Sequence, residues 1–361
     1  MTTPQPAQTA VLLFNLGGPD DLASVEPFLV NLFSDREIIE LPFGAALQPL
    51  MARLIARLRG PSVRRNYQRI GGGSPQLRIT RAQAAALEER LNAAPGDAAP
   101  YRVFIAMRYS KPGVDEALGA ITAAGIRRIV TLTLFPHYSK ATTGSSRNEF
   151  ERVLRRPRWS TSRFTVTHID RYPDDRRYLD AMTETVRRAW LKIPDNRRER
   201  AVILFSAHGL PQKFIDQGDP YVEHIEATRR GILMRLGVAN RQELAYQSRT
   251  GPVKWLGPGT EETLVELARD GVRDVLVVPL SFVSDHIETL YEVDLLFAEA
   301  AQKAGITGYY RPEALNTEPL FIDALAGLVS DHITAVARPR RGVCQGHSGA
   351  VGPAALTGAA V

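Results

Sequence analysis

The chain has 361 residues, of which 44% are hydrophobic and 23% charged, a composition typical of a folded protein long enough for two domains. The longest apolar runs, such as 10–14 and 275–280, are far shorter than the roughly 20 residues that span a bilayer, so no transmembrane helix is predicted. The formal net charge of +6 suits an anionic partner, but no nucleic-acid-binding motif accompanies it, so no nucleic-acid partner is expected.

The N-terminal segment 1–9 is polar and lacks both a basic start and a small-residue cleavage site, so it is not interpreted as a signal peptide. The protein is therefore predicted to be cytoplasmic. Seven β-rich runs follow and alternate with amphipathic helical stretches. These predicted strands cover residues 10–16, 101–107, 127–135, 164–169, 201–206, 242–248 and 273–282.

Two internal correspondences indicate that the chain is duplicated. The segment PGVDEALGAITAAGIRRIVTLTL, from Pro112, aligns without a gap with PGTEETLVELARDGVRDVLVVPL, from Pro258. The segment AVLLFNLGG, from Ala10, aligns with AVILFSAHG, from Ala201. A chance likeness between amphipathic helix–strand units is the alternative explanation.

The alternation of strands and helices predicts an α/β fold with parallel sheets. Continuously apolar strands such as VLLF and VILF indicate that helices cover both faces of each sheet. We predict two similar Rossmann-like domains, residues 1–160 and 161–338, with the active-site cleft between them. Residues 339–361 are rich in small residues, lack a hydrophobic period and are predicted to form a disordered tail.

The segment 48–59, QPLMARLIARLR, predicts an amphipathic helix. Its apolar side carries Leu50, Leu54, Ile55 and Leu58, and arginines occupy the other positions. Two interpretations are open. The helix packs on a sheet, or it lies on a membrane surface or beside an apolar ligand site. The second interpretation would make the protein peripheral at the inner face of the membrane.

Ligands of open α/β sheets bind beyond the carboxyl ends of the strands, which directs attention to the polar residues found there. His208 follows an apolar strand and precedes Gly209, a position that presents an imidazole at a loop. The alternative is a hydrogen-bonded loop histidine without a catalytic role.

Glu288 has the spacing of a helix capping box with Asp285, which is its alternative interpretation. Capping does not explain Glu292 one turn further on, because two carboxylates on one helical face repel each other unless a cation or proton compensates. His286 lies in the same cluster.

These segments together resemble the ferrochelatase family from about Val11 to His332. The matching motifs are NLGGPD at Asn15, YQRIGGGSP at Tyr67, AMRYSKP at Ala106, PHYSKATTGSS at Pro136, SAHGLP at Ser206, GDPY at Gly218, QSRTGPVKWLGP at Gln247 and SFVSDHIETLYEVD at Ser281. SAHGLP and SDHIETLYE are the most specific. The resemblance implies an enzyme that inserts Fe²⁺ into protoporphyrin IX, held between two Rossmann-like domains.

The resemblance also implies roles for individual residues. His208 and Glu288 are the catalytic and metal-binding pair, and Glu292, Asp285 and His286 form a path for protons or metal beside them. The implied porphyrin-binding residues are Leu16, Ser74, Arg108, Tyr109, Tyr138, Ser139 and Trp255. Arg108 is a candidate for a propionate contact, with a structural salt bridge as the alternative.

An imidazole nitrogen and a carboxylate oxygen can hold ferrous iron weakly enough to release it. Two pyrrole N–H protons must leave before iron is bound, so His208 or Glu288 must accept them. Which of the two meets iron first is left open.

The sequence departs from the family in two ways. Some relatives bind an iron–sulfur cluster through four cysteines, whereas Cys344 is the only cysteine here, so no cluster is predicted. Leu16 replaces the family's pocket methionine.

Three other functions compete with a protoporphyrin ferrochelatase. Coproporphyrin III as substrate would need more basic groups for its two extra propionates, and the TTGSS segment after Lys140 and Ala141 resembles the protoporphyrin-using branch more closely. A chelatase for cobalt or nickel is the second, because a His/Glu pair does not fix the metal. The third is a non-catalytic two-lobed tetrapyrrole carrier, which would not need His208 and Glu288.

Overall fold

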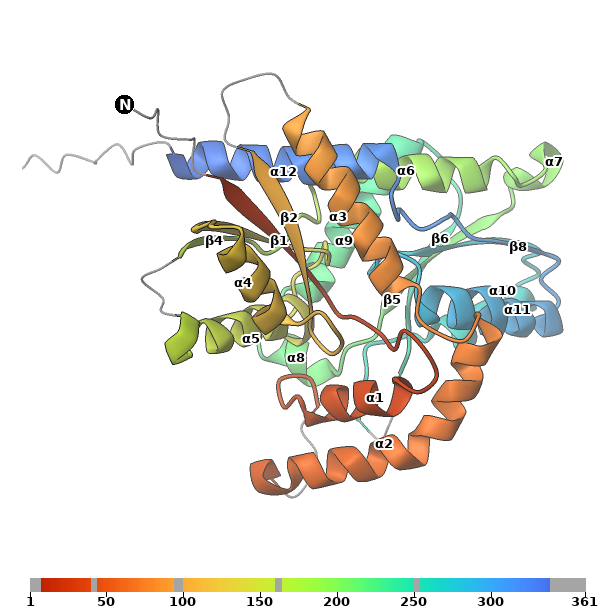
Figure 1. Ribbon diagram of the computed structural model, residues 1–361. Helices are drawn as coiled ribbons and strands as arrows, with labels where there is room; N and C mark the ends of the chain where they lie inside the picture. Colours follow the sequence, from red (N-terminus) through yellow and green to blue (C-terminus); the bar gives the residue numbers. More distant parts are fainter. Residues whose placement is uncertain (1–7, 40–43, 94–99, 160–163, 250–252, 338–361) are drawn as a thin grey trace, which may run out of the picture.

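The computed structural model describes residues 8–39, 44–93, 100–159, 164–249 and 253–337, and contains two four-stranded parallel sheets (Figure 1). The first has the order β2-β1-β3-β4 and the second the order β6-β5-β7-β8. The strands of the first sheet are β1 (Thr9–Asn15), β2 (Tyr101–Met107), β3 (Arg128–Thr133) and β4 (Thr165–Ile169). Those of the second are β5 (Val202–His208), β6 (Gln242–Gln247), β7 (Asp274–Pro279) and β8 (Gly308–Tyr310).

All seven predicted strands are present, and the parallel α/β fold is confirmed. The sequence reasoning missed β8, which has only three residues and therefore gives no period-2 pattern. The predicted tail at 339–361 lies outside the described residues.

The two sheets have the same topology, which supports the internal duplication. In both, the first strand in chain order lies between the second and the third. The aligned helices α4 (Val114–Ala123) and α10 (Thr260–Arg269) also begin alike. The backbone amide of Gly113 donates to Glu116 Oε2 at 2.9 Å, and the amide of Gly259 donates to Glu262 Oε2 at 3.1 Å. Both helices thus start with the same carboxylate cap.

The first sheet extends past the predicted domain boundary at residue 160. Thr165 pairs with Arg128 and Ile169 pairs with Leu132, so β4 completes the first sheet. The prediction assigned this strand to the second domain. The pairing instead places the division between the two sheets after β4.

Helices cover both faces of the sheets, and one hydrophobic core connects the two halves. It includes Leu13 and Val130 from the first sheet and Phe205 and Leu276 from the second. Its covering helices are α3 (Gln76–Asn92), α6 (Arg176–Trp190), α9 (Tyr221–Leu236) and α12 (Pro319–Ala337). The outer faces are packed by α4, α5 (Ser145–Leu154), α10 and α11 (Ala298–Ala304).

By length and composition alone, α12 is the one described helix that could cross a membrane. It packs on α6 and α3, and its side chains Phe321, Leu325 and Val329 are buried. These contacts are those of a core helix. Figure 1 shows α3 crossing α12 at the top of the molecule, with α6 near one end of α12.

Two helices stand apart from the layered core, on the side where the strands end (Figure 1). They are α1 (Val25–Ser34) and α2 (Gly44–Arg69), which pack on each other around Phe28, Phe33 and Ala52. The end of α2 reaches the second half of the molecule, because Arg69 pairs with Glu299 at 2.8 Å. These two helices form a lip beside the carboxyl ends of both sheets.

The remaining short elements are α7 (Asp195–Arg198), α8 (Gln212–Asp216), a 3-10 turn at Pro157–Trp159 and two π-helices. The π-helices are η1 (Lys140–Gly144) and η4 (Glu288–Phe297). Both follow the third strand of their sheet. Long π-helices are rare and occur mostly at functional sites.

Candidate active site

His208 and Glu288 form a hydrogen bond at the carboxyl edge of the second sheet. His208 is the last residue of β5, and Glu288 is the first residue of η4, which follows the neighbouring strand β7. His208 Nδ1 lies 2.7 Å from Glu288 Oε2, and their side chains are 31% and 16% exposed. The pair is therefore reachable from outside while its polar contact is largely shielded from water.

The hydrogen bond fixes where the His208 proton lies. An ionised carboxylate only accepts, so Nδ1 carries the hydrogen and donates it to Glu288. In the neutral imidazole, Nε2 then keeps its lone pair free. A carboxylate that orients a histidine in this way is the usual partner of metal-binding imidazoles.

The capping interpretation of Glu288 is not what the structure contains. The backbone amide of Asp285 does not donate to the Glu288 carboxylate; it donates to Asn316 Oδ1 at 2.9 Å. The Glu288 carboxylate points instead at His208, Ser248 and Gln247, at 2.7, 3.0 and 3.3 Å. Its orientation toward these three polar side chains favours a chemical role over a capping one.

Ser248 links the two carboxylates of η4. Its hydroxyl lies 3.0 Å from Glu288 Oε2 and 2.6 Å from Glu292 Oε2, so both acids share one face of the helix. Ser248 has a φ of 62°, a left-handed conformation that a serine adopts at some cost. Sequence reasoning missed this residue individually, although it lies within the QSRTGP motif.

The pKa values of the two carboxylates are driven apart. Burial alone would raise the pKa of Glu288, but the positive charge and hydrogen bond of His208 outweigh burial and hold that pKa well below its usual range. Burial and the negative charge of Glu288 raise the pKa of Glu292 to about 7. Burial opposes the charge on His208, but Glu288 overcomes it and raises the His208 pKa. Glu288 is thus ionised, while Glu292 gains and loses a proton near neutral pH.

His286 lies close to the pair but is held neutral. Its Nδ1 lies 3.1 Å from the carbonyl oxygen of Ser284, which can only accept, so Nδ1 carries the hydrogen. Its buried Nε2 has no hydrogen-bond partner among the described residues and lies 4.0 Å from Glu288 Oε1. Burial lowers its pKa. His286 therefore presents a second bare nitrogen near Glu288.

Phe282 packs against both imidazoles and was not singled out from the sequence. Its ring lies 5.9 Å from the His208 ring, edge to face, and 4.1 Å from the His286 ring. Such contacts limit rotation of both imidazoles.

Asp285 does not face Glu288. It accepts hydrogen bonds from Thr289 at 3.1 Å and Asn316 at 2.8 Å, and pairs with Arg311 at 3.4 Å. Among the predicted path residues, Glu292 and His286 therefore lie beside the pair, whereas Asp285 anchors the loop before η4.

Glu292 lines a cavity on the outer side of the His208–Glu288 pair. This cavity has a volume of about 650 Å³ and is lined by Glu292, Ser248, Gln247 and the exposed carboxylates of Glu261 and Glu262. His208 and Glu288 do not line it. Ser248 and Glu292 thus stand between the catalytic candidates and solvent.

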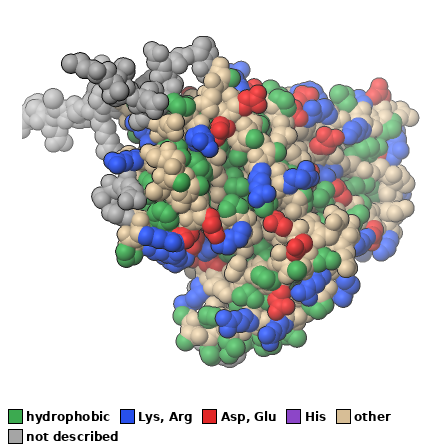
Figure 2. All heavy atoms as spheres, viewed as in Figure 1, with side chains coloured by type: hydrophobic (Ala, Val, Ile, Leu, Met, Phe, Trp, Pro, Cys, Tyr) green, Lys and Arg blue, Asp and Glu red, His purple; other side chains and the backbone are tan. Residues whose placement is uncertain are grey.

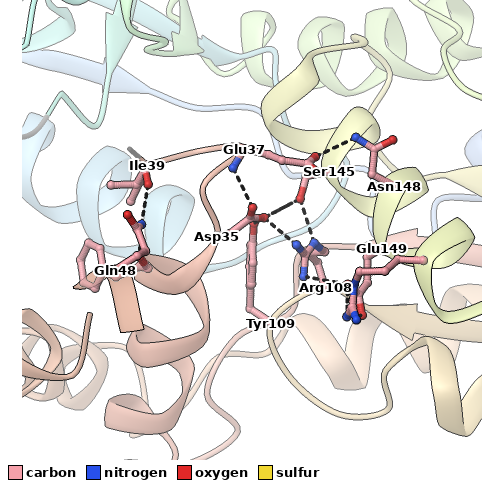
Figure 3. Close-up of polar contacts among 11 residues, drawn as sticks. Asp35, Glu37, Ile39, Gln48, Arg108, Tyr109, Ser145, Asn148 and Glu149 are labelled. Atoms are coloured by element: carbon pink, nitrogen blue, oxygen red, sulfur yellow. Dashed lines mark hydrogen bonds and ion pairs between the residues drawn. The ribbon is translucent and has the colours of Figure 1, made fainter. Parts of the chain in front are cut away.

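Arg108 and Tyr109 belong to a different polar cluster, shown in Figure 3. Asp35 Oδ2 accepts from Arg108 Nη2 at 2.7 Å, from the Tyr109 hydroxyl at 2.6 Å and from the Ser145 hydroxyl at 2.6 Å. Glu149 lies 3.9 Å from Arg108. The Arg108 guanidinium is therefore neutralised by protein carboxylates, as the salt-bridge alternative anticipated.

The cluster borders a cavity of about 970 Å³ between α1, α4 and α5. Arg108 and Tyr109 line it, but His208 and Glu288 do not. The structure thus does not bring these two residues to the His208–Glu288 pair, and their porphyrin contact stays a prediction.

The other predicted porphyrin residues lie around the strand ends. Leu16 packs against the lip helices, and the Ser74 amide donates to the carbonyl of Pro19 at 2.7 Å. Trp255 forms an isolated β-bridge with Pro211. Its ring packs against Gly209, the residue after His208, closely enough to contact a Cβ placed there. Tyr138 and Ser139 contact the second half of the molecule.

Tyr138 and Ser139 are held at the junction of the two halves. The Tyr138 amide donates to His224 Nδ1 at 3.2 Å, and the Ser139 hydroxyl donates to Asp219 at 3.0 Å. The porphyrin roles of both stay predictions as well.

Comparison with known proteins identifies the family. The ferrochelatase family model matches residues 8–333. The chain belongs to the ferrochelatase family. It is 51% identical over 324 residues to a ferrochelatase of Geotalea uraniireducens (strain Rf4), covering 90% of this chain and 98% of that one. It is 54% identical over 324 residues to a ferrochelatase of Geobacter metallireducens, covering 89% and 98%, and 47% identical over 327 residues to one of Synechocystis, covering 90% and 83%.

Solved structures confirm the chelatase fold at much lower sequence identity. SirB from Bacillus subtilis with Fe³⁺ aligns with a TM-score of 0.52 and 14% identity, over 90% of this chain and 95% of that one. The sirohydrochlorin chelatase SirB in complex with cobalt, from Bacillus subtilis subspecies spizizenii, aligns with a TM-score of 0.50 and 13% identity, over 90% and 94%. Two Rossmann-like halves are thus the architecture of this ferrochelatase-family chain.

The raised pKa of Glu292 predicts a pH-dependent stability. The native state binds this proton more tightly than the unfolded chain does, so the stabilisation is present below pH 4.5 and is lost as pH rises through about 7. Compared with Glu292→Gln, the wild type should lose about 1–2 kcal/mol of unfolding free energy between pH 5 and pH 8. Urea unfolding at both pH values measures this. Glu261→Gln, an exposed carboxylate of the same cavity, is the control, and equal pH dependence in both variants would contradict the shift.

Proposed function

We propose that this ferrochelatase-family chain inserts Fe²⁺ into protoporphyrin IX to form protohaem, the last step of haem synthesis, with release of two protons. The observation that carries this proposal is the 2.7 Å contact between His208 and Glu288, two residues 80 positions apart. Family membership indicates the reaction, and this contact provides a base and a carboxylate at the carboxyl edge of the second sheet.

His208 is proposed to accept the pyrrole protons. Its Nε2 lone pair is available only when the imidazole is neutral, and the Nδ1–H bond to Glu288 stabilises the imidazolium that forms. The raised pKa of His208 makes it a stronger proton acceptor than an ordinary histidine. Glu288, ionised at neutral pH, balances the added charge.

Protons are proposed to leave through Ser248 and Glu292. The Ser248 hydroxyl has one hydrogen, so it donates to one carboxylate while accepting from the other when that acid is protonated. Glu292, with a pKa near 7, can take up and release protons at the cavity that borders it. His208, Glu288, Ser248 and Glu292 together provide a continuous line of hydrogen-bonding groups from the imidazole to that cavity.

Iron is proposed to meet few protein ligands. No group of three or more His, Cys, Asp or Glu residues is arranged to hold a metal in the part of the chain that the structure describes. Glu288 and His286 offer one oxygen and one bare nitrogen, a weak set suited to a metal that must move on to a porphyrin. The reaction as proposed uses no resident cofactor, and the single Cys344 cannot supply the four thiolates of an iron–sulfur cluster.

Protoporphyrin is favoured over coproporphyrin by the state of Arg108. Two extra propionates call for additional cationic groups, and the Arg108 guanidinium is already paired with Asp35 and Glu149. Coproporphyrin III stays the alternative substrate.

A peripheral membrane contact is proposed for α2. The helix carries six arginines, Arg53, Arg57, Arg59, Arg64, Arg65 and Arg69, and no acidic residue. Its leucines Leu47, Leu50, Leu54 and Leu58 are 45%, 62%, 48% and 72% exposed. Figure 2 shows hydrophobic and basic side chains side by side on the lower part of the molecule, where Figure 1 places α2. Exposed leucines flanked by arginines suit an anionic lipid surface, here the inner face of the membrane around the cytoplasm.

Replacing the catalytic pair should abolish metal insertion. In anaerobic mixtures of Fe²⁺ with either porphyrin, wild type should metallate protoporphyrin IX faster than coproporphyrin III. His208→Ala and Glu288→Ala should each lower kcat by at least about 100-fold, because the proton acceptor or its counter-charge is lost. Metalloporphyrin absorbance measures the rates, and circular dichroism checks folding.

His332→Ala on α12 is the matched control and should keep wild-type activity. Normal rates in the folded His208 and Glu288 variants would refute their roles. Metallation of neither porphyrin by the wild type would refute the function itself.

The membrane contact predicts a defect in vesicle binding. The triple variant Leu50→Ser, Leu54→Ser, Leu58→Ser should bind phosphatidylglycerol vesicles at least about tenfold more weakly, because each leucine loses part of its roughly 1.5–3 kcal/mol of burial. Flotation with phosphatidylglycerol or phosphatidylcholine vesicles measures the binding. Met234→Ser, an 82% exposed residue on α9, is the control and should bind as wild type does. Unchanged binding of the triple variant would exclude α2 as the contact.

A further inference from the structure

The backbone of His208 is held on both sides by hydroxyl groups. Its amide N lies 2.8 Å from Ser281 Oγ, and its carbonyl O lies 3.0 Å from the Tyr221 hydroxyl. The two hydroxyls are themselves 2.6 Å apart. Ser281 follows β7, and Tyr221 begins α9, so segments from two other elements meet the backbone of the residue that ends β5.

The directions of these three hydrogen bonds follow from donor and acceptor counts. The His208 carbonyl only accepts, so the single hydrogen of the Tyr221 hydroxyl must point to it. The Tyr221 oxygen then accepts the Ser281 hydrogen, and Ser281 Oγ accepts the His208 amide hydrogen. The result is a closed ring of three hydrogen bonds in which every donor hydrogen is used once. Loss of either hydroxyl would break this ring.

Tyr221 is in turn attached to the first half of the molecule. Its amide donates to Asp219 Oδ1 at 3.1 Å, and Asp219 Oδ2 accepts from the Ser139 hydroxyl at 3.0 Å and the Lys140 amide at 2.7 Å. Asp219 and Tyr221 are 4% and 5% exposed. The ring of His137, from the same segment as Ser139, packs edge to face on the Tyr221 ring at 6.2 Å.

We propose that Tyr221 is a positioning residue that fixes the His208 imidazole against Glu288 and, through Asp219, ties its position to the loop after β3. This inference rests on the proposed function, because it assigns Tyr221 a role in presenting the proton acceptor. Tyr221 does not touch the reacting atoms; it acts through the His208 peptide.

The contact between His208 and Glu288 is sensitive to small displacements of the His208 backbone. His208 ends its strand, so beyond this residue the sheet no longer holds the backbone by ladder hydrogen bonds on both sides. The Nδ1–Oε2 distance of 2.7 Å leaves little room for a displaced imidazole. A misplacement of about 1 Å in a catalytic group can reduce rates by orders of magnitude.

The test compares two buried tyrosines that differ in what their hydroxyls contact. Tyr221→Phe removes one hydroxyl from the ring and leaves the aromatic packing. Tyr172→Phe is the matched control, because the Tyr172 hydroxyl is buried without a hydrogen-bond partner among the described residues. For iron insertion into protoporphyrin IX, Tyr221→Phe should lower kcat by about tenfold with the porphyrin KM within twofold of wild type. Tyr172→Phe should change neither constant.

A second pair of variants tests the closed ring. Ser281→Ala should lower kcat about as much as Tyr221→Phe, and the double variant should fall no further than either, because the groups act as one unit. Ser281→Thr, which keeps a hydroxyl, should recover most of the activity.

A readout independent of activity follows the His208 imidazole directly. In protein labelled with ¹⁵N-histidine, His208 is assigned by comparison with His208→Asn and titrated by NMR. Its midpoint should fall in Tyr221→Phe, because the contact with Glu288 loosens, and should stay unchanged in Tyr172→Phe. This measurement remains decisive even if the wild type metallates no porphyrin, an outcome that would refute the proposed function alone.

Lower kcat together with a lower His208 midpoint, in Tyr221→Phe only, supports the proposal. Equal effects of Tyr221→Phe and Tyr172→Phe overturn it, as does a loss of kcat with an unchanged His208 titration. A change confined to the porphyrin KM also overturns it, because Tyr221 would then act on binding of the ring.

Discussion

The hydrogen bond between His208 and Glu288 depends on the order of strands in the second sheet. Because β5 and β7 are adjacent and parallel, with Ser206 paired to Pro279, the residues that follow them meet at one edge. A sheet with another order would separate the imidazole from the carboxylate. The duplicated first half has the same order, but Asn15 ends β1 where His208 ends β5, and Lys140 begins η1 where Glu288 begins η4, so no imidazole–carboxylate pair forms there. One half of the duplication thus carries the candidate acid–base pair, and the other supports it from Ser139 and Lys140.

The second constraint is that two carboxylates one turn apart have opposite protonation behaviour. Glu288 faces an imidazole and stays ionised, whereas Glu292 faces Glu288 and keeps its proton up to about pH 7. Pairs of titratable groups whose surroundings separate their pKa values are a common mark of acid–base sites. The π-helix contributes because its wider turn presents both acids to the single hydroxyl of Ser248. The like-charge repulsion that the sequence spacing implies is relieved when Glu292 keeps its proton.

Sequence reasoning found the parts of this site that depend on local pattern. Apolar runs predicted the seven longer strands, and the residues just beyond them included His208 and Glu288. Contacts formed by distant segments were not predictable in this way. Ser248 acts through a left-handed backbone conformation that no composition rule assigns to serine, and Tyr221 reaches His208 only after α9 has packed. Arg108 looked available for a propionate because its partner Asp35 lies 73 residues away in the chain.

The distribution of charge connects the lip to the chemistry. The excess of six positive charges in the whole chain equals the number of arginines on α2, so the rest of the molecule is close to balanced. The last of these, Arg69, pairs with Glu299 and lies over the ring of Tyr291, 5.2 Å away. Tyr291 belongs to η4 and lies between Glu288 and Glu292 in sequence. The basic, leucine-bearing helix is therefore joined at its end to the helix that carries both acids. A porphyrin is flat and largely apolar, and it partitions into lipid more readily than into water. A lip that rests on an anionic surface would therefore hold the strand ends, and the pair at their edge, close to where such a substrate collects.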